Sequence, residues 1–152
     1  MRFKGWFQVT LQLGLLALLY AVTAPHHAAL HGDPVVIAML SLSIVVAVVA
    51  VRAHPWGNFN VHPEPKTNGQ LIQTGIYRHI RHPMYSALIL FGLACVLTRP
   101  TAISIVLLIA LSAVLYWKAV TEEAMLREQY PDYAKYCEQS SRFVPSLSRN
   151  RH

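Results

Sequence analysis

Apolar residues occupy four long stretches that contain no Asp, Glu, Lys or Arg: 5–32, 34–51, 82–98 and 100–117. A membrane's hydrocarbon core is about 30 Å thick, so a helix rising about 1.5 Å per residue needs about 20 residues to cross it. The first stretch has length to spare, and the second and fourth are just adequate. The third is short, so we expect that helix to tilt, lie against its neighbour or stop below the far surface. The pattern predicts an all-α integral membrane protein with four transmembrane helices.

The boundaries of these helices follow from the charges and prolines beside them. The third and fourth form a hairpin, and the expected ranges are about 5–24, 34–52, 83–98 and 101–130. A loop, 53–82, precedes the hairpin and a tail, 131–152, follows it, all within one domain of 152 residues. A cleaved signal peptide is the disfavoured alternative for the first stretch, because its apolar run is long and three more segments follow.

Composition supports the same class. Hydrophobic residue types make up 54% of the chain, charged types 13%, and the mean hydropathy is +0.36. About a quarter of an average soluble domain is charged, so an ordinary soluble globule and a disordered chain are both excluded. The two cysteines, Cys95 and Cys137, are too few for a disulfide framework and are not spaced for a metal knuckle. Three histidines in the expected outer turn lack a carboxylate pair, and we expect no metal site: His26, His27, His31.

The net charge of +6 indicates how the chain is oriented in the membrane. On a soluble protein it would suggest a nucleic-acid partner, whereas on a membrane protein it indicates basic loops held at the cytoplasmic face. With both termini in the cytoplasm, twelve of the thirteen Lys and Arg residues lie inside and only Arg99 lies outside. The sequence therefore predicts an N-in/C-in protein that binds no nucleic acid. Its function is expected in the cytoplasmic loop and tail, which hold most of its polar residues.

The start of the third helix is a candidate anion site. Pro83 suits the first turn of a helix and biases His82 away from helical angles. The unpaired backbone N–H groups of that turn lie near Tyr77, Arg78 and Arg81. A helix N-terminus beside arginines favours a carboxylate or a phosphate.

Several of these residues also have simpler explanations. Arg78 and Arg81 are also placed to be simple topological anchors, and Glu123 to be the solvated end of a helix. Lys118 and Glu122 are four residues apart, as in a plain helical ion pair. Three tyrosines spaced by three residues suit an amphipathic interfacial helix as well as a ligand site: Tyr130, Tyr133, Tyr136.

A longer ordered pattern favours the functional interpretation. The segment from Tyr77 to Tyr85 reads Tyr-Arg-x-x-Arg-His-Pro-x-Tyr, and after the apolar hairpin come Glu122-Glu123 and then Arg142-Phe-Val-Pro145. Between about Phe59 and Pro145 the chain resembles the isoprenylcysteine carboxyl methyltransferase family and its relatives among integral-membrane phospholipid methyltransferases. The first two helices match only as hydrophobic segments.

The resemblance implies S-adenosylmethionine as methyl donor, bound at the cytoplasmic face by the stretch before the third helix and the end of the fourth. Carried over by position, the cofactor contacts are His62, Gly69, Gln70, Leu71, Ile72, Tyr77, His82, Pro83, Met84, Tyr85 and Glu122. The family has a substrate-side arginine where this chain has Lys118. That departure puts the family's usual carboxyl substrate in doubt, because lysine cannot grip a carboxylate in bidentate fashion.

The chemistry of the donor assigns roles to these residues. Methyl transfer from a sulfonium mainly needs positioning and a dry pocket. Arg81, His82 and the helix N–H groups suit the donor's carboxylate, and Glu122 suits its ribose or its ammonium. Lys118 is expected on the acceptor side. An amine acceptor needs a base, and Glu123 or a histidine is the nearest candidate.

We therefore expect an integral membrane enzyme, of the inner membrane if bacterial, that transfers a methyl group to a lipid-like or prenylated acceptor. Its active site is expected at the cytoplasmic face, with the acceptor entering from the bilayer. Phospholipid amine N-methylation and a non-catalytic membrane protein on the same scaffold are the alternatives. Binding of the donor separates the catalytic alternatives from the last one.

Overall fold

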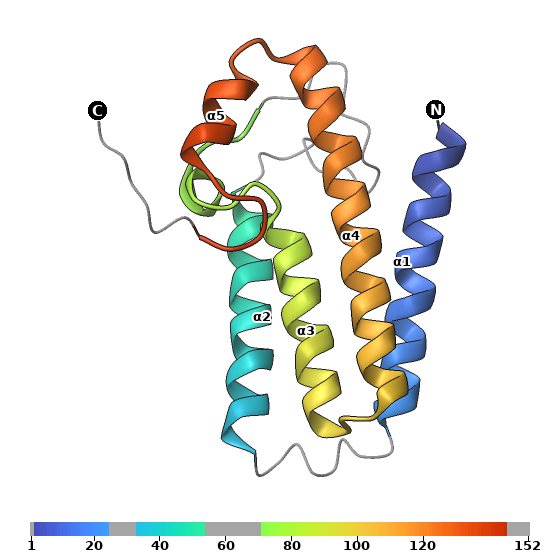
Figure 1. The fold of residues 1–152 in the computed structure, drawn as a ribbon. Helices are drawn as coiled ribbons and strands as arrows, with labels where there is room; N and C mark the ends of the chain where they lie inside the picture. The colour runs from blue at the N-terminus through green and yellow to red at the C-terminus, as the bar shows by residue number, and fades with distance from the viewer. Residues whose placement is uncertain (1, 25–32, 54–70, 146–152) are drawn as a thin grey trace.

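The computed structural model describes residues 2–24, 33–53 and 71–145, and over these it is helical. Four long helices run side by side (Figure 1): α1 (Arg2–Thr23), α2 (Pro34–Arg52), α3 (Pro83–Thr98) and α4 (Ala102–Gln129). A short helix, α5 (Tyr133–Gln139), lies at the end of the bundle where α1 begins and α4 ends. In the described residues β pairing is limited to one bridge, between Ile80 and Ser141. The prediction of an all-α protein is confirmed for this part of the chain.

Helix length separates α3 from the others. Among the described helices, α1, α2 and α4 are long and apolar enough to cross a membrane, while α3 is a shorter apolar helix of 16 residues. As expected of a short segment, α3 lies against its neighbours, packing on α2 most extensively and also on α4 and α1. The apolar helices make this an integral membrane protein. The count of four spans and the N-in/C-in orientation stay predictions.

Local chemistry fixes where the helices begin. Asp33 caps α2 by accepting a hydrogen bond from the Val35 backbone N–H at 2.8 Å, with Pro34 in the first helical position. Thr101 and Ser104 form a reciprocal capping box at the start of α4. Arg99, in the turn before it, donates from Nη1 to the Val22 carbonyl at 3.1 Å. The α3–α4 turn is thus tied to the end of α1.

A glycine lets the helices approach closely in the core. The buried cluster comprises Leu19, Cys95, Val96, Leu107, Leu111 and Leu115. Beside it, a Cβ atom on Gly92 would lie 2.8 Å from Leu108 Cδ1 and 3.4 Å from Leu19 Cδ2, so a side chain there would require the Leu108 side chain of α4 to move. Small residues at helix contacts serve this purpose in membrane bundles. The outward faces carry exposed apolar side chains such as Ile44 and Ile103, as a lipid-facing surface requires.

The part of the chain that follows α4 folds back over the start of α3. Tyr136 of α5 donates its hydroxyl to the Tyr77 carbonyl at 2.6 Å, which docks α5 on the 3-10 turn Gly75–Arg78. The C-terminal segment, Ser140–Pro145, then pairs with the loop before α3. Its backbone bonds are Arg81 N to Ser141 O at 2.8 Å, Ser141 N to His79 O at 3.0 Å, and His82 N to Arg142 O at 3.1 Å. The expected tail therefore contains a helix and an ordered segment that covers the candidate site.

Candidate active site at the junction of α3, α4 and the C-terminal segment

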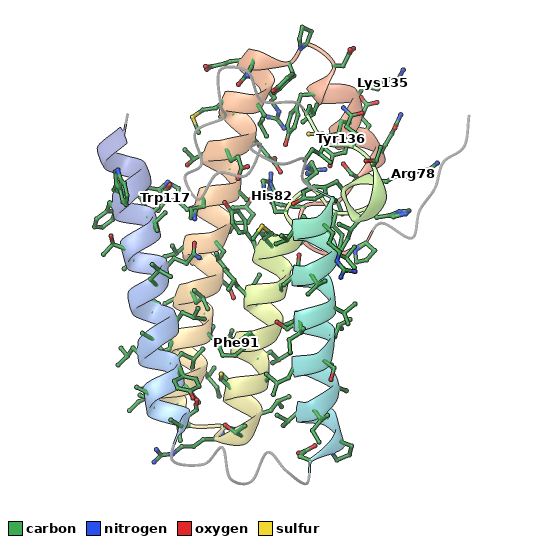
Figure 2. All side chains as sticks on the ribbon, turned by 180° about the vertical axis from the view of Figure 1, so that it is seen from behind. Arg78, His82, Phe91, Trp117, Lys135 and Tyr136 are labelled. Carbon is green, nitrogen blue, oxygen red and sulfur yellow. The ribbon has the colours of Figure 1, made fainter. Side chains whose placement is uncertain are left out.

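Polar side chains gather where α3 begins and α4 approaches its end. Figure 2 shows His82 at this end of the bundle, below Tyr136, with Trp117 on the side of α4 that faces α1. The two glutamates of α4, Glu122 and Glu123, both reach His82, one at each ring nitrogen. They differ in everything else they contact, and they divide the site into two halves.

The Glu122 half is open to solvent. Tyr85 donates its hydroxyl to Glu122 Oε2 at 3.0 Å, and His82 Nδ1 lies 3.6 Å from the same oxygen. The His82 and Tyr85 rings are stacked, with centroids 5.3 Å apart and planes 1° from parallel. The Glu122 side chain is 30% exposed, and the contacts it makes among the described residues run through Oε2. Its other oxygen is therefore placed to accept hydrogen bonds from a ligand.

The Glu123 half is a closed ionic network. The Glu123 side chain is 2% exposed and accepts two bonds from Arg142, from Nη2 to Oε2 at 2.7 Å and from Nε to Oε1 at 3.0 Å. Arg81 Nε donates to Oε1 at 3.0 Å, and His82 Nε2 lies 3.2 Å from it. The hydrogen bond to Glu123 raises the pKa of the already cationic Arg142. Such charge-assisted bonds are the strong ones, and these join α4, the loop before α3 and the C-terminal segment.

Two nitrogens of the Arg81 guanidinium, Nε and Nη1, donate to protein groups. Besides Glu123, its guanidinium donates from Nη1 to the carbonyls of Cys137, at 3.1 Å, and Ser140, and to Ser140 Oγ at 3.3 Å. The last carbonyls of a helix lack partners within the helix, so this contact caps α5. Arg81 thus holds α5 and the C-terminal segment in place. Its expected contact with a donor carboxylate stays a prediction.

Buried tyrosines line the contact between α5 and the 3-10 turn. Burial raises the pKa of Tyr77, Tyr133 and Tyr136 above the ordinary tyrosine value near 10. For Tyr77 the charge of Glu122 adds to the rise in pKa, so its hydroxyl lies in the field of the open half of the site. These phenols stay neutral and act through packing and hydrogen bonds.

Lys118 faces α1. Its side chain is buried, its Nζ donates to Gln12 Oε1 at 2.7 Å, and the ammonium lies 5.2 Å from the centroid of the Tyr85 ring. The simple pair with Glu122 is absent from the ion pairs of the described residues. One turn along α1, Gln8 is also buried and donates from Nε2 to Thr121 Oγ1 at 3.5 Å. A seam of four polar side chains therefore runs between α1 and α4: Gln8, Gln12, Lys118, Thr121.

The structure brings most of the predicted site residues to this one end of the bundle. Tyr85 stacks on His82, and Glu122 and Glu123 contact its ring nitrogens. Arg81 bonds Glu123, Lys118 lies against the Tyr85 ring, the charge of Glu122 acts on Tyr77, and Pro83 and Met84 belong to the first turn of α3. Leu71 and Ile72 are half-buried in the irregular stretch before the 3-10 turn, and Arg78 is exposed. His62, Gly69 and Gln70 lie outside the described residues, as do His26, His27 and His31. Among the residues described, no three His, Cys, Asp or Glu side chains gather closely enough to hold a metal ion.

Sequence reasoning gave no role to Arg142, Gln8 or Gln12. Arg142 belongs to the same ordered sequence pattern as the paired glutamates. An arginine without an assigned role in that pattern was the signal that could have identified it as their partner. The two glutamines are four residues apart in an otherwise apolar helix. Polar residues inside a membrane helix usually face another helix or a functional cavity, and that rule points to both.

Comparison with known proteins identifies the family. Residues 34–133, which are 100 of the 152, match the model of the phospholipid methyltransferase family. The chain belongs to this family. The expectation of an integral-membrane methyltransferase family is thereby confirmed, and the matched range includes α2, α3, α4 and both site glutamates. Helix α1 lies outside it.

A curated relative extends over nearly the whole chain. The cobalt-zinc-cadmium resistance protein CzcN of Cupriavidus metallidurans is 28% identical to it over 151 residues. The alignment covers 97% of this chain and 65% of that relative, so the chain spans just under two thirds of the relative's length.

Proposed function

We propose that this phospholipid methyltransferase family member transfers a methyl group from S-adenosylmethionine to a lipid-like or prenylated acceptor at the cytoplasmic face of the membrane. The observation that carries the proposal is the open carboxylate of Glu122, oriented by Tyr85 and His82 beside the first turn of α3. This arrangement lies in the matched part of the chain.

The residues present fit the chemistry of this donor. When bound, S-adenosylmethionine supplies an electrophilic methyl group on a sulfonium centre. Glu122 is suited to the ribose hydroxyl pair or to the ammonium group, since carboxylates accept both. The first turn of α3 has no side-chain cap at His82, and among the described residues nothing accepts from the Met84 backbone N–H. That N–H and the positive helix end suit the carboxylate of the donor.

The acceptor side is proposed at Lys118. The ammonium adjoins the Tyr85 ring, whose hydroxyl bonds Glu122, so an anionic acceptor held there would lie next to the donor site. A carboxylate or thiolate acceptor needs no base. For an amine acceptor we assign proton transfer to His82 through Nδ1, which lies 3.6 Å from Glu122, because arginine donors hold both oxygens of Glu123. Glu123 and Arg81 are then positioning residues.

The family match favours one alternative acceptor, a phospholipid amine. Methylation there would be on nitrogen and would require the base just named. A non-catalytic protein on the same scaffold would bind neither donor nor acceptor. These three possibilities differ in ligand and product, so a donor titration followed by product analysis separates them.

The test is calorimetric titration of the full chain in detergent with S-adenosylmethionine and its demethylated product. We expect one donor molecule per chain and, in Glu122→Gln, affinity at least tenfold weaker, because a lost hydrogen bond to a charged group is worth about 1.5–3 kcal/mol. Glu128→Gln, on the exposed surface of the same helix, is the matched control and should bind like the wild type. Absence of heat and of competition at millimolar ligand would overturn the proposal.

Product analysis then identifies the acceptor. A prenylated cysteine and phosphatidylethanolamine, each incubated with donor and protein, give an ester and a secondary amine respectively. Formation of neither product, with donor binding intact, would overturn the two acceptor classes while leaving the donor site standing.

A further inference from the structure

Helix α1 lies outside the part of the chain that matches the family, yet it contacts α4 beside the candidate site through the buried amide of Gln8 and the half-buried amide of Gln12. We propose that Gln8 and Gln12 form, with Lys118, a subsite for the head group of the acceptor. The head group that fits carries an anionic group with an N–H donor beside it. This inference rests on the proposed function and names what recognises the acceptor.

The first observation is a buried lysine that forms no ion pair among the described residues. Lys118 is 2% exposed, and its contacts among the described residues are the neutral amide of Gln12 and the face of the Tyr85 ring. None of the ion pairs in that part of the chain includes it. A desolvated ammonium attracts an anion far more strongly than an exposed one does, because the surroundings screen the charge less. The seam is therefore electrostatically prepared for a carboxylate or a phosphate.

The second observation is an unsatisfied amide oxygen. Gln8 is 1% exposed, and its Oε1 is the one buried side-chain polar atom in the described residues that has no hydrogen-bond partner. Its Nε2 makes only a long bond, 3.5 Å, to Thr121. Buried acceptors are nearly always paired, so an unpaired one inside a seam marks the place of a donor that a ligand brings. An N–H group on the acceptor is such a donor.

The spacing of the two glutamines sets the geometry of the head group. They are four residues apart, which is about 6 Å along a helix. Gln8 is nearer than Gln12 to the end of α1 at which α5 lies (Figure 1). A head group held by both residues would place its anion toward Lys118 and its N–H toward Gln8, and both a phosphoethanolamine and an N-acylated cysteine carry such a pair of groups. Both possess the same chemistry, an anion with a neighbouring N–H.

A purely structural seam makes a different prediction. Polar side chains also hold membrane helices together, and in that role Gln8 and Gln12 would affect stability without selecting a ligand. The experiment therefore measures which ligand the protein prefers, and not only how stable it is. It uses pairs of probes that differ in the N–H group while the anion is kept.

The probes are two matched pairs. Short-chain phosphatidylethanolamine is compared with short-chain phosphatidylcholine, which keeps the phosphate and has no N–H. N-acetyl-S-farnesylcysteine is compared with S-farnesylthiopropionate, which keeps the carboxylate and has no amide. Binding to the full chain in detergent is measured by ligand-induced thermal stabilisation and by calorimetry, with no methyl donor present. The pair that the wild type discriminates identifies the source of the head group.

We expect the wild type to bind the N–H member of one pair at least tenfold more tightly than its partner. Gln8→Met, similar in size but without the amide, should erase that preference. Gln12→Glu, which places a carboxylate beside Lys118, should weaken both members of the pair at least tenfold. Thr10→Val, at an exposed position of α1, is the control and should keep the preference. Affinity for S-adenosylmethionine should stay within twofold in every variant.

Two results would overturn the subsite. One is an undiminished preference in Gln8→Met, and the other is a wild type that discriminates neither pair. If Gln8→Met does not fold, Gln8→Asn, which withdraws the amide by one methylene, replaces it under the same criteria. Failure of the wild type to bind the methyl donor, with the probe preference intact, would instead count against the proposed function alone.

Discussion

Two adjacent glutamates, Glu122 and Glu123, offer a sharp test of how the site is built. In the structure they do different work, since the first is open to a ligand and the second ties three segments together. The substitutions to compare are Glu122→Gln and Glu123→Gln, which remove the same charge with almost no change in volume.

The structure gives the magnitudes. Removing one partner of a buried charge pair costs about 3–5 kcal/mol, because the other partner stays buried and uncompensated. Arg142 is 26% exposed and can regain some hydration, so we place Glu123→Gln at the lower end, about 3 kcal/mol. At about 2–4 °C per kcal/mol for a chain of this size, the thermal midpoint should fall by about 6–12 °C. Glu122→Gln still accepts from Tyr85 and is partly solvated, so its cost should stay below about 1 kcal/mol.

The assay is thermal unfolding in detergent, monitored by the reaction of a thiol-reactive dye with exposed cysteine. Cys95 is buried in the core cluster and reacts only when the bundle opens, while the half-buried Cys137 is first replaced by serine. Donor affinity is measured on the same samples. We expect the main effect of Glu123→Gln to be a loss of stability. The main effect of Glu122→Gln should be a loss of donor affinity, with little loss of stability. A Glu123→Gln protein with the wild-type midpoint and no turnover would refute the positioning role and restore Glu123 as the base.

Three further predictions concern packing, alkaline stability and topology. Gly92→Val should lower stability by about 1–3 kcal/mol, because its Cβ alone would meet Leu108 Cδ1 at 2.8 Å, whereas Gly14→Ala, with open space around it, should not. Equal thermal midpoints would show that the Leu108 side chain or α3 moves to make room. Burial raises the pKa of Tyr77, Tyr133 and Tyr136 above the value near 10 that they have when unfolded, so the unfolded chain loses protons first and stability should fall as pH rises above about 10; full tyrosinate absorbance at that pH in a folded protein would contradict this. Tags at both termini should be digested by protease only from the cytoplasmic side, because twelve of thirteen basic residues then lie inside; cleavage of either tag from the outer side would overturn the orientation.

The helices were predictable because strong local signals define them. Stretches free of charge fix the apolar segments, and Pro34 and Pro83 mark the first positions of α2 and α3 as the structure has them. The fourth apolar stretch ends near Trp117, yet α4 continues to Gln129, and the absence of a helix breaker before Pro131 allowed that extension to be predicted.

Partner choice within the site was not predictable from spacing. Lys118 is four residues from Glu122, but its ammonium turns to Gln12, which is 106 residues away in sequence and close only because α1 packs on α4. Glu123 likewise takes Arg142 as its bidentate partner from a segment whose return across the bundle depends on backbone pairing with the loop before α3. A single sequence carries the local helical geometry but not the relative rotation of distant helices.

The backbone bridge between Ile80 and Ser141 has a consequence for biosynthesis. All four long helices precede Ser141 in the chain, so their residues are synthesised before the segment that pairs with the loop. The helices and the segment that completes the site are therefore separate parts of the chain, made in that order. A nascent chain that stopped between Gln129 and Arg142 would keep its hydrophobic helices but leave Glu123 buried without its bidentate cation. Such a product would reach the bilayer as an inactive protein. Synthesis of the segment after Gln129 therefore decides whether the bundle becomes an enzyme.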